Sequence, residues 1–138
     1  MTLRIARAGP HEIADCLAIR RAVFIEEQGV PEALEVDGLD GEAIHYLGRF
    51  GGMPIATARV RIVEGASKVQ RVAVLREHRA TGTGAAIMRA IMEDSDLPQR
   101  FTLGSQESAV GFYERLGFRV VGEPFMDAGI PHRTMVYP

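Results

Sequence analysis

The residues with the clearest chemical meaning form a glycine-containing turn between a β-like run and an amphipathic stretch. Residues 72–75 lead into a turn with Arg79, Gly82 and Gly84, after which apolar residues recur at helical spacing. Glycine lets the backbone approach a ligand closely, and the unpaired N–H groups and dipole of a helix N-terminus favour phosphate. An arginine beside them can add a charge-assisted hydrogen bond. The pattern therefore indicates a site for a phosphate-bearing ligand.

Two common phosphate-binding motifs are excluded by the residues that follow the second glycine. A Walker loop needs Lys and then Ser or Thr after its last glycine, but Gly84 is followed by Ala85 and Ala86. A dinucleotide-binding fingerprint needs a third glycine near position 87, where Ile87 stands. Taken alone, the motif leaves open a second interpretation, in which the turn caps a helix and binds no ligand.

A second motif, FYERLGF at residues 112–118, favours the ligand-binding interpretation of the turn. Together with Arg79-x-x-Gly82-x-Gly84 it resembles the GCN5-related N-acetyltransferase (GNAT) family, which binds acetyl-CoA at the glycine turn. The segments AVFIEEQGVPEALEVDGLD, AIHYLGRF and GIPHRTMVY extend the resemblance over nearly the whole chain and look like the ElaA-like branch of that family. One departure is Ala80, where many members carry glycine. We expect it to alter loop flexibility more than binding.

The resemblance implies a cofactor site built mainly from backbone. The N–H groups of the turn would bind the pyrophosphate of acetyl-CoA. The strand at residues 71–75 would separate from its neighbour at 101–104, so that Val72 and Val74 pair with the pantetheine arm through main-chain hydrogen bonds. The residues assigned to this site are Val72, Ala73, Val74, Arg79, Ala80, Thr81, Gly82, Thr83, Gly84, Ala85, Gln106 and Tyr113.

The resemblance also implies two catalytic groups. The Val74 N–H would stabilise the oxyanion that develops when a primary amine attacks the thioester directly and forms a tetrahedral intermediate. Tyr113 matches the family's usual general acid for the leaving thiolate, and a phenol with a pKa of about 10 can donate a proton at neutral pH. A structural interpretation of Tyr113 stays open, because Phe112, Leu116 and Phe118 surround it in the sequence.

The acceptor side is less well defined by the sequence. A carboxylate, an imidazole or a water chain must remove protons from the amine, and the side-chain candidates are Glu26, Glu27, Glu35, Asp37, Asp40, His45 and His132. Among them we favour Glu27 and His45 as catalytic groups. The resemblance places Gln28, Asp37 and His132 around the acceptor cleft. Each candidate also has a structural alternative, as a solvated loop carboxylate or a hydrogen-bonded histidine.

Two further features of the acceptor side have open interpretations. The acidic residues of the segment 29–41 could attract a cationic amine by Coulomb attraction. Arg59 and Arg71 lie on neighbouring β-like runs and could either line a cleft or be exposed on the sheet.

The overall composition argues against several other classes of protein. Sixteen basic and eighteen acidic side chains give a net charge of −2, which disfavours a nucleic-acid binder. No apolar stretch reaches the length of a membrane span, and the first residues lack a signal-peptide core, so we expect a cytoplasmic protein. The single cysteine, Cys16, excludes an internal disulfide and a thiolate zinc cluster, and we expect no metal.

The elements that position these residues alternate between two periodicities. Helical spacing predicts helices at residues 10–26, 85–92 and 108–116, and the segment 29–41 is expected to be a loop with a turn of helix near 31–34. Strands are predicted at 2–6, 43–50, 55–63, 68–75, 101–104, 118–121 and 134–137. The order β-α-β-β-β-α-β-α-β-β predicts a mixed α/β layer structure, and the length suits one domain. The resemblance implies a GNAT-like fold with a central, mostly antiparallel sheet flanked by helices.

The sequence thus predicts a single N-acetyltransferase domain over residues 1–138 that uses acetyl-CoA. Its acceptor would be a small-molecule or peptide amine, with no nucleic-acid or membrane partner, and a homodimer is compatible with the family. The alternative that stays open is a non-catalytic acyl-CoA-binding or regulatory module.

Overall fold

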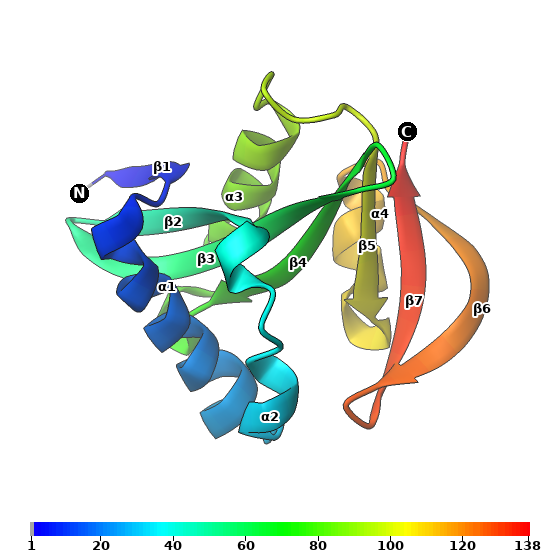
Figure 1. Ribbon diagram of the computed structural model, residues 1–138, viewed down its shortest axis with the longest axis horizontal. Coiled ribbons are helices and arrows are strands. Elements are labelled where there is room, and N and C mark those ends of the chain that lie inside the picture. The colour runs from blue at the N-terminus through cyan, green and yellow to red at the C-terminus, as the bar shows by residue number, and fades with distance from the viewer. Residues whose placement is uncertain (1) are drawn as a thin grey trace.

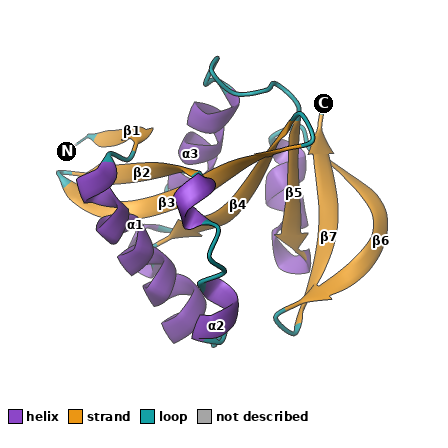
Figure 2. Cartoon of the chain, viewed as in Figure 1, coloured by secondary structure: helices purple, strands orange, loops and turns teal. Residues whose placement is uncertain are grey.

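The computed structural model describes residues 2–138, which form one seven-stranded sheet with helices on both of its faces (Figures 1 and 2). The strands are β1 (Leu3–Arg7), β2 (Ile44–Phe50), β3 (Met53–Val63), β4 (Ala66–Val74), β5 (Phe101–Gln106), β6 (Arg119–Asp127) and β7 (Ile130–Tyr137). The α-helices are α1 (Ile13–Arg20), α2 (Glu32–Glu35), α3 (Thr83–Met92) and α4 (Val110–Arg115). Short 3-10 turns occur at η1 (Pro10–Glu12), η3 (Asp40–Glu42), η4 (Arg76–His78) and η5 (Glu107–Ala109), and a π-helical segment, η2 (Arg21–Glu27), continues α1.

The strand order in the sheet is β1-β2-β3-β4-β5-β7-β6. Every neighbouring pair is antiparallel except β4 and β5, which run parallel and are joined through α3. A parallel connection needs a crossover, and a helix is the usual one. The sheet is therefore two antiparallel halves that meet at a single parallel contact, and Figure 1 shows the halves diverging from that contact.

Apolar side chains on the two faces of the sheet define two cores. On one face, Ile87 and Ile91 of α3 pack with Val60 and Val69 of the sheet, in a cluster that also includes Tyr113. On the other face, Cys16 and Ile19 of α1 pack with residues of β2 and β4. The helical spacing of the apolar residues places each helix with one side against the sheet. Cys16 is buried in this second core, where it packs as a small apolar residue.

The structure confirms the predicted fold class and element order but changes several boundaries. The first helix is continuous from residue 10 to 27, and its last turns widen, with Gln28 N–H donating to the Val23 carbonyl at 3.1 Å. In the segment 29–41, α2 is the predicted turn of helix, displaced by one residue, and the beginning of η3 is an additional turn.

The largest change of boundary is in the last hairpin. Strands β6 and β7 reach residues 127 and 130, whereas we predicted strands ending at 121 and starting at 134. Gly122 and Pro124 are unfavourable inside a strand, so the sequence pattern of β6 ends before them. The pairing of β6 with β7 shifts register between Val121 and Phe125. Ala128 and Gly129 both have positive φ, at 51° and 75°, which gives a tight two-residue turn.

Candidate active site

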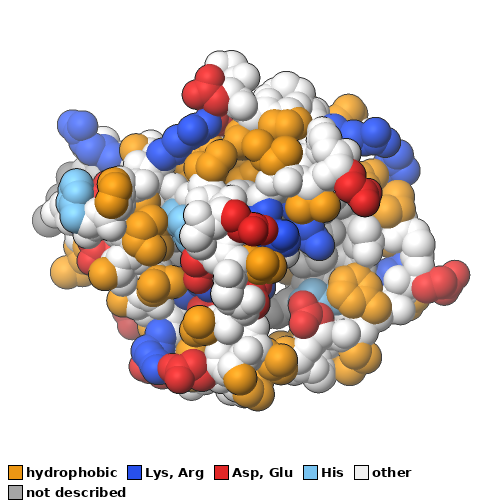
Figure 3. Space-filling view, viewed as in Figure 1, with side chains coloured by type: hydrophobic (Ala, Val, Ile, Leu, Met, Phe, Trp, Pro, Cys, Tyr) orange, Lys and Arg blue, Asp and Glu red, His pale blue; other side chains and the backbone are white. Residues whose placement is uncertain are grey.

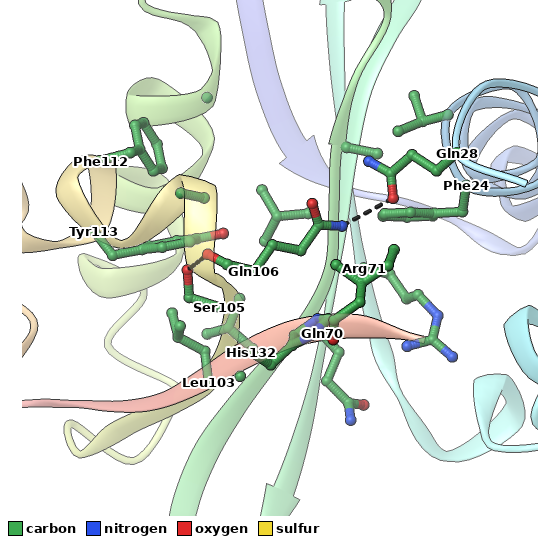
Figure 4. Close-up of a pocket in the computed structure, with 18 of the residues that line it drawn as sticks. Phe24, Gln28, Gln70, Arg71, Leu103, Ser105, Gln106, Phe112, Tyr113 and His132 are labelled. Atoms are coloured by element: carbon green, nitrogen blue, oxygen red, sulfur yellow. Dashed lines mark hydrogen bonds between the residues drawn. The ribbon is translucent and has the colours of Figure 1, made fainter. Parts of the chain in front are cut away.

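The site forms where β4 and β5 separate. The two strands pair only at Ser67–Phe101, Lys68–Thr102 and Val69–Leu103, although β4 continues to residue 74 and β5 to 106. A cavity of about 860 Å³ opens in the gap beyond these pairs (Figure 4). We predicted that residues 71–75 would separate from the strand at 101–104. The pairing of β4 with β5 ends at Val69 and Leu103, before residue 71, in agreement with this prediction.

A β-bulge in β4 helps to open this gap. Thr57 of β3 faces Ala73, but Arg59 faces Gln70, so β4 carries one extra residue. Arg71 lies in the bulge with a φ of 56°. A bulge bends its strand and increases the local twist, and it thereby turns the second half of β4 away from β5.

The backbone of β4 beyond the bulge offers donors to the cavity. The Leu75 N–H donates to the Ile55 carbonyl of β3 at 2.9 Å. Because N–H directions alternate along an extended strand, the Val74 N–H points to the opposite side, and Val72 shares that direction. The Val74 carbonyl accepts from Arg79 Nε at 2.9 Å. Val72, Ala73 and Val74, which we expect to bind the cofactor, all line the cavity.

The glycine turn lies at the same cavity. Arg79, Ala80, Gly82, Gly84 and Ala85 line it. The first hydrogen bond within α3 runs from the Ala86 N–H to the Gly82 carbonyl at 3.0 Å, so the amides of residues 83–85 precede the helical ladder and are available to a ligand. Gly82 has a φ of 84°, and Ala80 also takes a left-handed conformation, with a φ of 61°.

Two residues of the turn support it without lining the cavity. The Thr81 hydroxyl donates to the His78 carbonyl at 2.6 Å and lies 3.0 Å from the Thr83 hydroxyl, which is buried. Only the backbone of Thr81 and Thr83 is therefore left for a ligand. A Cβ at Gly84 would lie 3.4 Å from the ring of Phe112, which brings α3 close to α4.

Tyr113 projects from α4 into the gap, and Figure 4 shows its hydroxyl pointing into the cavity. Its ring packs edge-on against Phe112 at 4.9 Å and Phe118 at 6.0 Å between centroids. Burial raises the pKa of Tyr113 to about 12, because a phenolate is poorly solvated there. The ring of Tyr113 therefore belongs to the core, as the structural interpretation requires, while its hydroxyl faces the cavity, as a role in the chemistry would require.

Glu27 is not placed as we predicted for a base. Its carboxylate forms a two-point ion pair with Arg79, with N–O distances of 2.6 and 2.7 Å, and Arg76 lies 3.5 Å away. The hydrogen bonds from Arg79 hold the pKa of Glu27 below its usual range, opposite to the change that suits a base at neutral pH. Glu27 does not line the cavity and instead connects the first helix to the glycine turn.

His45 is also a structural residue. Its side chain is buried outside the cavity lining, and its Nε2 lies 3.0 Å from the Asp40 carbonyl. Since a carbonyl only accepts, Nε2 carries the proton. The buried Nδ1 has no partner among the residues the structure describes.

His132 is differently placed. It lines the cavity, and its Nδ1 lies 2.7 Å from the Ile130 carbonyl. The carbonyl fixes the proton on Nδ1, so Nε2 of the neutral ring is an acceptor. Of the histidines that we considered as bases, this one lies at the site with a free lone pair.

Gln28 and Gln106 meet across the cavity. The Gln106 amide donates to Gln28 Oε1 at 2.8 Å, as the dashed line in Figure 4 shows. This contact confirms that the end of the first helix and the end of β5 lie together. It brings a residue predicted on the acceptor side against one predicted on the pantetheine side.

A buried ionic network holds the segment 29–41 against the sheet. Arg20 and Arg59 are 1% and 0% exposed. Arg20 binds Glu35 and Asp40, and Arg59 binds Asp37 and Asp40, with a closest approach of 2.5 Å to Asp37. Hydrogen bonds from Arg59 hold the pKa of Asp37 far below its usual range.

This network removes two expectations. The carboxylates of Glu35, Asp37 and Asp40 are balanced by three guanidinium groups, those of Arg20, Arg59 and Arg71, so they cannot act as an acidic field for the amine. Asp37, which we predicted at the acceptor cleft, does not line the cavity. It instead pairs with Arg59 and thereby holds the segment 29–41 against the sheet. Arg71 lines the cavity, which is one of the two interpretations left open by the sequence. Arg59 fits neither of them, because it is buried outside the cavity lining.

The sequence analysis missed several residues at the cavity. Phe24, Phe125 and Asp127 line it. The only signal for the last two was the Asp-Ala-Gly turn at 127–129, which predicts a tight hairpin and therefore longer β6 and β7. Within residues 2–138, no group of three or more His, Cys, Asp or Glu is arranged to hold a metal ion, and no helix is long and apolar enough to cross a membrane.

A parallel pair that opens into a cavity, beside a glycine turn at a helix N-terminus, is the arrangement that the resemblance to CoA-dependent acyltransferases implies. The model of the acetyltransferase (GNAT) domain family matches residues 12–137, and the chain belongs to this family. It is 38% identical over 128 residues to the uncharacterized N-acetyltransferase YjcF of Bacillus subtilis, an alignment that covers 91% of each chain.

Solved structures support the same assignment. The crystal structure of Escherichia coli ElaA superposes with a TM-score of 0.85 at 26% identity and covers 99% of both chains. An acyl-CoA N-acyltransferase from Pseudomonas aeruginosa gives a TM-score of 0.86 at 27% identity, with 99% of this chain and 100% of that one covered. The resemblance predicted from the two motifs is confirmed.

Proposed function

We propose that this protein transfers the acetyl group of acetyl-CoA to a primary amine, with residues 1–138 acting as one catalytic domain. The observation that carries the proposal is the gap between β4 and β5. The Val74 N–H, the start of α3 and the Tyr113 hydroxyl all face one cavity there. We place the reaction in the cytoplasm, because its cosubstrate is a CoA thioester.

The residues around the cavity fit the parts of acetyl-CoA. The amides of residues 83–85 and the dipole of the ten-residue helix α3 suit a pyrophosphate. Glycine at positions 82 and 84 leaves the backbone open to close approach. Val72 and Val74 offer an unpaired strand edge to an amide-containing arm such as pantetheine. A cavity of about 860 Å³ has room for the arm and a small acceptor.

In this proposal the chain supplies an oxyanion donor and a hydrogen bond for the departing sulfur. The Val74 N–H stabilises the charge on the carbonyl oxygen as the amine attacks directly and a tetrahedral intermediate forms. The Tyr113 hydroxyl would lie on the other side of the arm. Its pKa of about 12 exceeds the roughly 8.5 of an alkyl thiol by more than three units, so complete proton transfer to the thiolate is uphill. Tyr113 therefore holds the thiolate by donating a hydrogen bond, and water completes the protonation.

We assign the removal of the amine proton to His132. Its Nδ1–H is bound to the Ile130 carbonyl, which leaves Nε2 to accept a proton from the attacking nitrogen, directly or through one water. Glu27 and His45, which we favoured from the sequence, are engaged elsewhere. Gln28 and Gln106 would orient the two substrates, since they bridge the cavity between them.

The test combines calorimetry with a thiol-release assay. Acetyl-CoA should bind with measurable heat and stabilise the fold, and amines should release free CoA. Tyr113→Phe should lower kcat about tenfold to a hundredfold, the worth of a charge-assisted hydrogen bond, with the Kd for acetyl-CoA changed less than about threefold.

Tyr137→Phe is the matched control, because Tyr137 packs on the same aromatic cluster but does not line the cavity. Its kcat should stay within about twofold of the wild type. Heat of binding without any thiol release across amines would support the acyl-CoA-binding module instead. No heat with CoA or acetyl-CoA would refute both functions.

A further inference from the structure

The acceptor side of the cavity has two walls, which come from segments far apart in the chain. One is the end of the first helix and α2, and the other is the turn between β6 and β7; Figure 1 shows these segments on opposite sides of the gap. Phe24, Val30 and Leu34 line the cavity from the first wall, and Phe125, Ala128 and Ile130 line it from the second. Both walls therefore carry several apolar side chains, beside the polar residues Gln28 and Glu35 on the first wall and Asp127 and His132 on the second.

The aromatic part of the second wall is held in place. The ring of Phe125 lies 5.6 Å from that of His132, with an angle of 33° between the planes. A Cβ at Gly104 would come within 3.2 Å of Phe125 Cζ, so glycine at this position allows the ring to rest on β5. Leu34 and Phe125 are nevertheless 53% and 39% exposed, and an apolar ligand between the walls would cover them.

The charges at the cavity argue against a polycation as the acceptor. Two carboxylates line it, those of Glu35 and Asp127. Glu35 is 3% exposed and is neutralised by Arg20 at 2.7 Å and Arg71 at 2.9 Å. Asp127, at the exposed tip of β6, makes no ion pair with any residue in 2–138. Lys68 also lines the cavity and makes no ion pair with any residue in 2–138, so a second positive charge on the acceptor would meet a cation.

We propose, on the basis of the function proposed above, that the acceptor is a compact monoamine with an apolar alkyl or aryl body. Phe24, Leu34 and Phe125 cover the body, Asp127 attracts the single ammonium group at the entrance, and His132 Nε2 receives the proton inside. Figure 3 shows the hollow on this face, with acidic and histidine atoms beside hydrophobic ones at its rim.

The primary test is the specificity of thiol release. Along propylamine, butylamine, pentylamine and hexylamine, kcat/KM should rise about fourfold for each methylene buried, and phenethylamine should exceed ethylamine more than tenfold. Spermidine, an amino sugar and a lysine-containing peptide should each react more than tenfold more slowly than hexylamine.

Two variants with matched controls locate the effect. Phe125→Ala should flatten the dependence on chain length to less than about twofold per methylene, while Phe50→Ala should preserve it, because Phe50 is 37% exposed but does not line the cavity. Asp127→Asn should raise KM for hexylamine about threefold at low salt, the range of an exposed ion pair. Asp96→Asn, at an exposed acid away from the cavity, should not.

Different results would overturn the proposed acceptor class and the proposed acetyltransferase function. Failure of acetyl-CoA to bind would overturn both. Binding of acetyl-CoA, together with faster acetylation of spermidine, the amino sugar or the peptide than of hexylamine, would overturn the apolar monoamine alone. A flat chain-length series in the wild type would do the same.

Discussion

Replacing Arg59 by Met tests whether the buried ionic network holds the acceptor wall. Arg59 is 0% exposed and donates to Asp37 at 2.9 and 2.5 Å, to Asp40 at 2.9 Å, and twice to the side-chain oxygen of Gln70. Methionine fills part of the same space but donates nothing. The change leaves two carboxylates facing each other without this cation.

The expected loss of stability follows from the burial of the partners. Removing one side of a buried ion pair costs about 3–5 kcal/mol. The side chains of Asp37 and Asp40 keep 25% and 21% of their exposure, so water recovers part of the loss and the lower value, about 3 kcal/mol, applies. With an unfolding entropy of about 2.1 cal/mol/K per residue, a chain of 138 residues should lose about 10 °C in Tm.

The measurement is thermal unfolding, with Arg61→Met as the control. Arg61 lies on the same strand but pairs with Glu42, whose side chain is 59% exposed. Such a surface pair contributes about 0–1 kcal/mol, so the control should lose at most about 3 °C. Equal shifts for the two variants would refute the argument. In the enzyme assay, Arg59→Met should raise KM for the amine more than it changes the Kd for acetyl-CoA, because the network holds the acceptor wall.

Two further predictions concern the turn and the network. Ala80 has a φ of 61°, a conformation that costs an L-residue about 1–2 kcal/mol, while glycine adds about 0.5–1 kcal/mol of entropy loss on folding. Ala80→Gly should therefore raise Tm by about 2–3 °C in a thermal scan, and a lower Tm would contradict this account of the turn. Asp37 has a pKa depressed by Arg59, so its contribution to stability is complete above the unfolded value of about 3.9 and is lost as pH falls through the lower folded value. Asp37→Asn should be less stable at pH 7 and show a shallower loss of stability between about pH 4 and pH 2 in urea titrations; parallel curves for variant and wild type would be inconsistent with the pairing.

The predicted elements with strong local signals agree with the structure. The apolar spacing of residues 85–92 corresponds to α3, and Gly82, with a φ of 84°, precedes its first residue. The hairpin at Gly51 and Gly52 joins β2 to β3, as its sequence predicts. In each case a few neighbouring residues carry the whole signal. The predicted boundaries of β6 and β7 were wrong because Gly122 and Pro124 interrupt the alternating pattern of β6.

The acceptor side could not be predicted in the same way. Glu27 and Asp37 are acidic residues in similar sequence surroundings, yet Arg79 and Arg59 engage them from 52 and 22 residues away. Whether a carboxylate is free, neutralised or at the cavity depends on which distant cation packs beside it. His45 and His132 differ for a related reason: the strand β7 contributes His132 to the cavity lining, whereas His45 of β2 is not part of it.

The sequence by itself determined the order of the elements and the backbone part of the site, because periodicity, glycine turns and the start of a helix are properties of neighbouring residues. Only the tertiary structure decided which ionisable groups are available for chemistry. It buried Arg20 and Arg59 against three carboxylates, opened the gap after Val69, and left His132 and Asp127 at the cavity. Charge neutralisation and exposure arise from contacts between residues far apart in the chain, and no local pattern specifies them.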